Sequence, residues 1–318
     1  MIDAHLDAWA GGDEAFVDET YRLVLRRAAE PEARERALAR LADGTLSRAT
    51  FLHELASSAE LDRVRQLDDA VAAGLAARGR GEPLRWLSAP AGTDERVIEI
   101  PWVLSRLSRD TVLEVGYANA EDAYLAALLR CRVGRLVGAD LASRPIDGFE
   151  TVTADARELP FENESFDTIL LVSTLEHIGA DNTVYGVEAD DDPAARIAAL
   201  RELRRVLRAS GRLLVTVPLG EPGDHGWFRQ DDIRGWTSLF TDAGLFVEEQ
   251  EPYELGEDGW RAAPAFSAAD VRYGERGPAA SAVLCTALSR SRLMRLATPS
   301  GLAVTAKRHV RTWRHRDT

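Results

Sequence analysis

The chain has 318 residues, 45% hydrophobic and 29% charged, which is an ordinary globular composition and more than one typical domain needs. Its net charge of −13 argues against nucleic acid as a partner of the body of the chain. The first residues lack the basic and apolar segments of a signal peptide, and no apolar run approaches the ~20 residues of a membrane span. We therefore expect a cytoplasmic protein.

Residues 1–68 are expected to form a small all-α module, because apolar side chains recur at helical spacing between residues 12 and 68. Asp43 and Gly44 break one helix from the next, Ser47 can cap the next helix, and Ser57 or Ser58 can cap a last short one. The stretch FVDETYRLVLRRAAEP…LADGTLSRATFLHELASSAEL resembles a short helical repeat of unassigned function, found in bacterial proteins beside enzymatic domains that are often glycan-related.

Residues 69–96 are rich in Gly, Ala and Pro and predict a linker. From about residue 97, strands alternate with helices, and continuous apolar runs such as TILLVS are typical of a parallel sheet covered on both faces. This pattern predicts a doubly wound, Rossmann-like α/β domain over residues 97–290, followed by a tail at 291–318. We expect strands at 111–116, 135–140, 149–153, 167–173, 211–217, 245–251 and 282–288, and helices near 97–107, 121–131, 194–208 and 231–243.

Three features fall at the carboxyl ends of the predicted strands, where such a sheet binds ligands. The first is the loop from Glu114 to Ala120. The second is Asp140, whose carboxylate can accept hydrogen bonds from both hydroxyls of a ribose. The third is Asp155, which can hold an adenine amino group while Ala156 offers its backbone N–H.

The ordered stretches VLEVG…GAD…ADARELPFENESFDTILLVSTLEH…LRELRRVLRASGRLLVTVP resemble a class I S-adenosylmethionine-dependent methyltransferase over residues 97–290. The resemblance implies S-adenosylmethionine as the cofactor, with Glu114 and Gly116 along its methionine part, Asp140 on the ribose, and Asp155 with Ala156 on the adenine. Four neighbours complete the candidate cofactor site: Tyr117, Asn119, Leu141 and Ser173.

The loop departs from the family at Ala118 and Ala120, where members usually have glycine. Glycine serves positive φ or close backbone approach. Alanine is the smallest alternative, Asn119 tolerates a left-handed conformation, and S-adenosylmethionine has no pyrophosphate to accommodate. We therefore expect the loop to bind S-adenosylmethionine, with the two alanines affecting its affinity for the cofactor more than its identity as a cofactor loop.

Two histidines are candidates for the catalytic base. His177 follows the strand next to the expected methyl donor, and His225 lies in the Gly/Pro-rich loop GEPGDHGWFRQ. Each histidine also has a non-catalytic interpretation: His177 can be a structural residue at the strand end, and His225 can be an ordinary loop residue. Three nearby polar residues can bind a polyhydroxylated acceptor: Asp181, Asn182 and Tyr185.

These features predict methyl transfer to a small-molecule or glycan-type acceptor, on a hydroxyl group. The rivals are a catalytically silent methyltransferase-like binding module and a nicotinamide-dependent oxidoreductase. No metal site is expected, because Cys131 and Cys285 lack ligand spacing and the acidic run EADDDP (188–193) reads as a solvated loop. Residues 289–318 carry eight Lys or Arg and one Asp, hence +7 against −20 for the rest, so the tail can dock on its own domain or on an anionic membrane surface.

Overall fold

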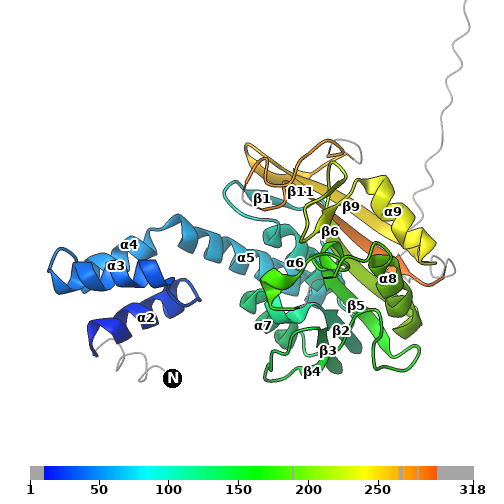
Figure 1. Cartoon of the computed structure of the whole chain (residues 1–318), viewed down its shortest axis with the longest axis horizontal. Coiled ribbons are helices and arrows are strands. Elements are labelled where there is room, and N and C mark those ends of the chain that lie inside the picture. The colour runs from blue at the N-terminus through cyan, green and yellow to red at the C-terminus, as the bar shows by residue number, and fades with distance from the viewer. Residues whose placement is uncertain (1–10, 188–189, 265–267, 278, 292–318) are drawn as a thin grey trace, which may run out of the picture.

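The computed structural model describes residues 11–187, 190–264, 268–277 and 279–291, in which a helical arm stands beside a sheet domain (Figure 1). The basic tail from residue 292 on lies outside the described residues. The arm comprises α2 (Asp13–Val24), α3 (Pro31–Ala42) and α4 (Arg48–Ala56). Its small core gathers Phe16, Tyr21 and Phe51, and the Ser47 hydroxyl caps α4, as predicted. The likeness of the arm to a bacterial repeat remains a prediction.

Helix α5 (Ala59–Arg80), capped by the side chain of Ser58, joins the arm to the sheet domain and packs along α6 (Arg96–Arg106). A Cβ added to Gly74 would lie 2.8 Å from the Cα of Pro101, so glycine permits this close packing. The guanidinium of Arg78 donates to the carbonyls of Leu107 and Ser108 at the end of α6. Residues 69–80, expected above to begin a linker, are therefore a helix packed on the domain.

The nine-stranded sheet has the order β1-β10-β9-β11-β6-β5-β2-β3-β4. Strands β4, β3, β2, β5 and β6 run parallel, and β11 is inserted antiparallel between β6 and β9. This arrangement confirms the predicted doubly wound α/β fold. The strands are β1 (Ser88–Pro90), β2 (Thr111–Val115), β3 (Arg135–Asp140), β4 (Glu150–Thr153), β5 (Phe166–Val172), β6 (Leu207–Pro218), β9 (Phe246–Gly256), β10 (Gly259–Ala262) and β11 (Ala282–Ser289).

Helices cover both faces of the sheet, which explains why its central strands read as continuous apolar runs. On β6, Leu214 packs into the core beneath α5, α6 and α7 (Asp122–Arg130), whereas Leu213 and Val215 pack against α8 (Ala195–Val206) and α9 (Ile233–Asp242). The seven predicted strands and four predicted helices of this domain are all present, with ends shifted by a few residues. The short strands β1 and β10, at one side of the sheet, were not predicted.

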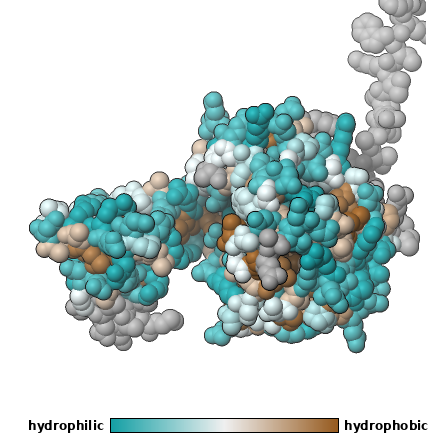
Figure 2. Space-filling view, in the orientation of Figure 1, coloured by the Kyte–Doolittle hydropathy of each residue, from teal (hydrophilic) through white to brown (hydrophobic). Residues whose placement is uncertain are grey.

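A hairpin and several short turns position side chains near the carboxyl ends of the strands. The hairpin of β7 (Gly223–Asp224) and β8 (Arg229–Gln230) carries the loop that contains His225. Of three 3₁₀ turns, η1 (Tyr117–Asn119) follows β2, η2 (Leu175–His177) follows β5, and η3 (Thr183–Tyr185) comes after η2. The surface visible in Figure 2 is mainly hydrophilic over both the arm and the sheet domain. Within the described residues, no helix is long and apolar enough to cross a membrane.

Candidate functional site

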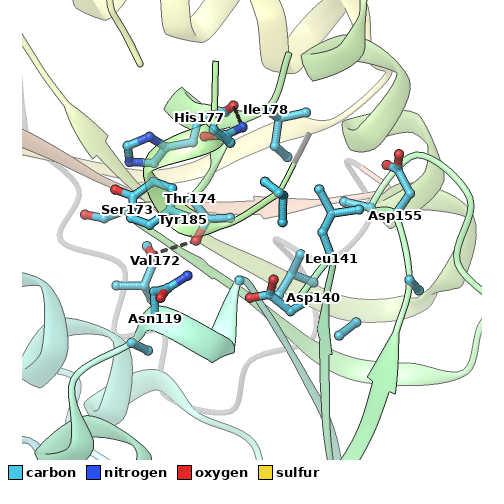
Figure 3. Close-up of a pocket in the computed structure, with 18 of the residues that line it drawn as sticks. Asn119, Asp140, Leu141, Asp155, Val172, Ser173, Thr174, His177, Ile178 and Tyr185 are labelled. Carbon is cyan, nitrogen blue, oxygen red and sulfur yellow. Dashed lines mark hydrogen bonds between the residues drawn. The ribbon is translucent and has the colours of Figure 1, made fainter. Parts of the chain in front are cut away.

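A cavity of about 770 Å³ opens at the carboxyl ends of β2, β3, β4 and β5. Its volume falls within the range of small-molecule sites, about 300–1,000 Å³. Figure 3 shows Asp140 and Asp155 on one side and Ser173 and His177 on the other. Of the eleven candidate cofactor-binding and catalytic residues, eight line it: Gly116, Asn119, Asp140, Leu141, Asp155, Ala156, Ser173 and His177.

The degenerate glycine loop needs only one glycine. Gly116 has φ +87°, and a Cβ there would lie 2.4 Å from the Thr174 hydroxyl, so both the backbone and its neighbour exclude a side chain. Ala118 and Asn119 lie in the 3₁₀ turn η1, and neither has a positive φ. Asn119 thus does not adopt the left-handed conformation considered above, and alanine at position 118 carries no backbone strain.

Asp140 ends β3 at the centre of the cavity wall. Its Oδ2 accepts the Ala118 N–H at 2.9 Å, and its Oδ1 accepts the Ala142 N–H at 2.9 Å. A carboxylate has about four acceptor positions, so both oxygens keep a lone pair for a ligand hydroxyl. The same carboxylate therefore holds the turn at Ala118 in place and faces the cavity.

Asp155 follows β4 and is held by Arg157. The Nε and Nη2 of Arg157 and its backbone N–H all donate to the Asp155 carboxylate, at 2.7–3.0 Å. Burial acts against ionisation, but these bonds outweigh it and lower the pKa of Asp155. Arg157 also donates to Asp190 at 2.7 Å. A ligand amino group at Asp155 must therefore share an acceptor that already has a partner.

The opposite end of the cavity is built around Ser173, which has φ 43° directly after β5. Such strain in a non-glycine residue is typical of functional positions. Its hydroxyl donates to the buried carboxylate of Glu99 at 2.8 Å and accepts from Arg96 Nη1 at 2.9 Å. Arg96 also donates to Glu99 at 2.9 Å and lines the cavity. Neither α6 residue was predicted from the sequence, because both precede the glycine loop and belong to no motif.

Two further carboxyl groups lie buried beside this end. Among the described residues, Glu95 Oε2 and Glu176 Oε2 have no hydrogen-bond partner. Burial raises the pKa of Glu95 to about 7 and the pKa of Glu176 well above its usual value. Together with Glu99 they make three carboxyl groups around the single guanidinium of Arg96. The region is therefore short of positive charge when all three are ionised.

His177 is the better placed of the two candidate bases. Its Nδ1 lies 2.9 Å from the Trp227 carbonyl, which can only accept, so Nδ1 carries the proton and Nε2 of the neutral ring is free to take one. Burial lowers the pKa of His177, and the ring therefore stays neutral near pH 7. Stacking on Trp227 and an edge contact with Tyr185 fix the ring.

Three predicted site residues do not line the cavity. Glu114 is buried and accepts the Tyr124 hydroxyl at 2.7 Å, and burial raises its pKa well above the usual value. Tyr117 packs its ring over Gly138 and beside Phe149. His225 is exposed and stacks on Phe228 with ring centroids 4.4 Å apart.

Residues 113–215 match the family model described as "Methyltransferase domain". A curated relative, the ubiquinone/menaquinone biosynthesis C-methyltransferase UbiE of Hahella chejuensis, is 30% identical over 118 residues, which are 37% of this chain and 41% of that protein. The chain thus spans about two fifths of that relative's length.

Two solved structures are also similar. The Burkholderia thailandensis 1,6-didemethyltoxoflavin-N1-methyltransferase, solved with its acceptor and S-adenosylhomocysteine, is 16% identical, with a TM-score of 0.42 over 86% of this chain and 91% of that one. A complex of the Haloferax volcanii Trm112 activator with a methyltransferase gives 19% identity and a TM-score of 0.39, over 58% and 83% of the two chains.

The order of the sheet, the cavity at its switch point and the family match together define the class. The chain contains a class I S-adenosylmethionine-dependent methyltransferase domain. The cofactor of this class is S-adenosylmethionine. The cavity fits such a group, because it offers a carboxylate at Asp140 and a bare backbone at Gly116.

Proposed function

We propose that the protein catalyses methyl transfer from S-adenosylmethionine to a small-molecule acceptor in this cavity. The observation that carries the proposal is that eight residues predicted from the methyltransferase motifs line one cavity of about 770 Å³. When bound, S-adenosylmethionine supplies an electrophilic methyl group. Asp140 would accept the ribose hydroxyls, and Asp155 with Ala156 would hold the adenine. Gly116 and Asn119 would lie along the methionine part.

Arg96 is the proposed partner of the methionine carboxylate. The two arginines that line the cavity are Arg96 and Arg157, and Arg157 is bound to Asp155 at the adenine end. Arg96 lies at the other end, and the hydrogen bonds of its Nη1 to Glu99 and Ser173 fix the guanidinium. A fixed guanidinium is suited to a carboxylate, because it presents its donors without further loss of side-chain entropy.

A hydroxyl acceptor remains our proposal for the methylated group. A hydroxyl must lose a proton during transfer, and the free Nε2 of His177 is a base at the end of the cavity that Ser173 also lines. The relative from Hahella chejuensis is a C-methyltransferase by name. An acidic C–H acceptor is thus a second candidate, since it needs the same base. His225 would touch the acceptor only at the outer edge, through the aromatic group of Phe228 and Tyr273.

A glycan-type acceptor has less support. The Asp181 carboxylate accepts from Thr183, and the Asn182 amide donates to the carbonyls of His177 and Ala180, so these groups brace their own loop. Tyr185 lines the cavity and contacts the ring of His177. We therefore keep the broader class, a small molecule, as the proposed acceptor.

Calorimetry with S-adenosylmethionine, S-adenosylhomocysteine and NAD tests the proposal. We expect both adenosyl compounds to bind and NAD to give no heat. Binding of NAD alone would support an oxidoreductase, and binding of none would support a silent module. If the protein binds S-adenosylmethionine but a screen with labelled cofactor gives no methylated product from any acceptor, this would also support a silent module.

A further inference from the structure

Glu176 is the neighbour of His177 on the 3₁₀ turn η2, and its position is not explained by cofactor binding. Its side chain is 5% exposed, and its Oε1 lies 3.9 Å from Nε2 of His177. Its Oε2 has no hydrogen-bond partner among the described residues. Such a buried carboxyl group is costly when it is ionised, and burial accordingly raises its pKa. A positive charge that forms beside it during the reaction would favour the ionised form.

The opposite nitrogen of His177 is already committed. Because Nδ1 donates to the Trp227 carbonyl, only Nε2 can take a proton, and Nε2 is the atom nearest to Glu176. The ring cannot turn freely, since Trp227 stacks on it at 5.2 Å between centroids and Tyr185 contacts it edge-on. The turn therefore holds a base and a carboxyl group in a fixed relation.

Other charged groups around the pair leave an excess of acid. From α6 and the residue before it come Glu95, Glu99 and one cation, Arg96, whose charge disfavours a protonated His177. Three further residues interact electrostatically with these carboxyl groups: Tyr273 of a loop, Tyr185 of η3 and Arg196 of α8. A positive charge on His177 is thus favoured by those of the three carboxyl groups that are ionised, and it is opposed by burial and by Arg96.

We propose that Glu176 is a positioning residue that stabilises the imidazolium formed when His177 removes the acceptor's proton. This inference rests on the proposed function. In that step the acceptor O–H bond breaks and the proton bonds to Nε2. The electron pair left on the acceptor oxygen would form the new bond to the methyl carbon while the methyl–sulfur bond breaks, and the electrons of that bond would stay on the sulfur of the departing S-adenosylhomocysteine. The positive charge that would otherwise be stranded in a buried ring then faces Glu176.

The pair titrates as a unit, because each group changes the proton affinity of the other. Burial favours the neutral form of Glu176, whereas an imidazolium at His177 favours the ionised form. Where Glu176 is ionised, the pair accepts a proton without creating net positive charge, and His177 is a stronger base. With a neutral side chain at position 176, only a buried imidazole remains, and burial makes it a weaker base. Removing the carboxylate should therefore lower the pH at which His177 titrates.

The test is an NMR titration of the His177 ring in the full-length chain, with the signal assigned by its loss in His177→Gln. In Glu176→Gln, which preserves side-chain size, we expect the midpoint to fall by roughly 1–3 pH units, the range for an opposite charge within about 4–6 Å. Asp181→Asn is the matched control. It removes an exposed carboxylate from the following loop, and the midpoint should stay unchanged.

An unchanged midpoint in a folded Glu176→Gln protein would overturn the proposal. If that variant does not fold, Glu176→Asp replaces it, because the shorter carboxylate lies farther from Nε2 and should produce a smaller fall in the same direction. No fall in that variant would also overturn it. Calorimetry separates the two proposals: a chain that fails to bind S-adenosylmethionine but keeps the shift loses only the proposed function.

Discussion

The two ends of the cavity hold their charges in opposite ways. At the β3–β4 end, Asp140 is bound by two backbone N–H groups and Asp155 by Arg157, so each carboxylate has partners before any ligand arrives. At the α6–η2 end, three buried carboxyl groups share Arg96, and two of their oxygens have no partner among the described residues. The first arrangement is suited to binding a fixed group, and the second to accommodating a charge that moves during the reaction.

The largest effect is expected at the α6–η2 end, from His177→Ala. Loss of a general base typically lowers a rate about 10²–10⁴-fold. Turnover should fall within that range, while affinity for S-adenosylmethionine, measured by calorimetry, changes little. His225→Ala is the control from the outer edge, with a much smaller loss expected. If His225→Ala lost more turnover than His177→Ala, the base would be His225, and the contrast between the two ends of the cavity would not hold.

Gly116→Ala should be the most damaging change to cofactor binding. A left-handed non-glycine residue costs about 1–3 kcal/mol, and the added Cβ also collides with Thr174. Affinity for S-adenosylmethionine should fall about 100-fold or more by calorimetry. Ala118→Gly, two positions on, should bind as well as the parent, because Ala118 has no positive φ. Equal losses in both variants would mean that the loop changes shape when the cofactor binds.

Asp140→Asn tests the β3–β4 end, where the carboxylates have partners before a ligand binds. The amide has one acceptor oxygen and would point N–H groups at the N–H of Ala118 or Ala142, so the loop and the ribose contacts weaken together. Loss of a charged acceptor costs about 1.5–3 kcal/mol, hence about tenfold or more in affinity. Asp122→Asn, which removes an exposed partner of Arg144 on the same side, is the control. Undiminished binding in Asp140→Asn would contradict the ribose assignment.

Glu95 concerns the stability of the fold and not turnover or affinity, and its effect should depend on pH. A carboxyl group whose pKa is raised to about 7 in the folded state stabilises the fold fully below its unfolded value near 4.5, and this contribution is lost as pH rises through 7. Glu95→Gln removes that loss, by about 3 kcal/mol at most. The melting temperature of Glu95→Gln relative to the parent should therefore rise between pH 5 and pH 8. A constant difference would show that the group is ionised throughout.

The sequence predicted the fold of the sheet domain because each local signal agreed with the tertiary structure. Apolar runs such as TILLVS became strands with a helix layer on each face, and the predicted ends differ from the observed ends by a few residues. The exception is residues 69–80. Their Ala and Gly content resembles a linker, but alanine favours helix and Gly74 is needed where α5 meets Pro101.

The β3–β4 end of the cavity was predictable for a similar reason. Gly116 directly follows β2, Asp140 ends β3, and Asp155 comes two residues after the end of β4. The carboxyl ends of parallel strands meet at one edge of a sheet, so chain order alone brings these residues together. The sequence alone also determined which histidines were available. It left open whether the glycine loop was intact, because that depends on the φ of Gly116 and Ala118.

Only the tertiary structure decided the α6–η2 end. Arg96 meets Ser173 across 77 positions of sequence, because α6 packs its first turn against the end of β5. The choice of His177 over His225 likewise depends on burial and on the Trp227 carbonyl, which lies 50 residues away. Sequence spacing encodes contacts within one strand–loop–helix unit, whereas the charge balance around a buried base arises from side chains of several units and exists only after they pack.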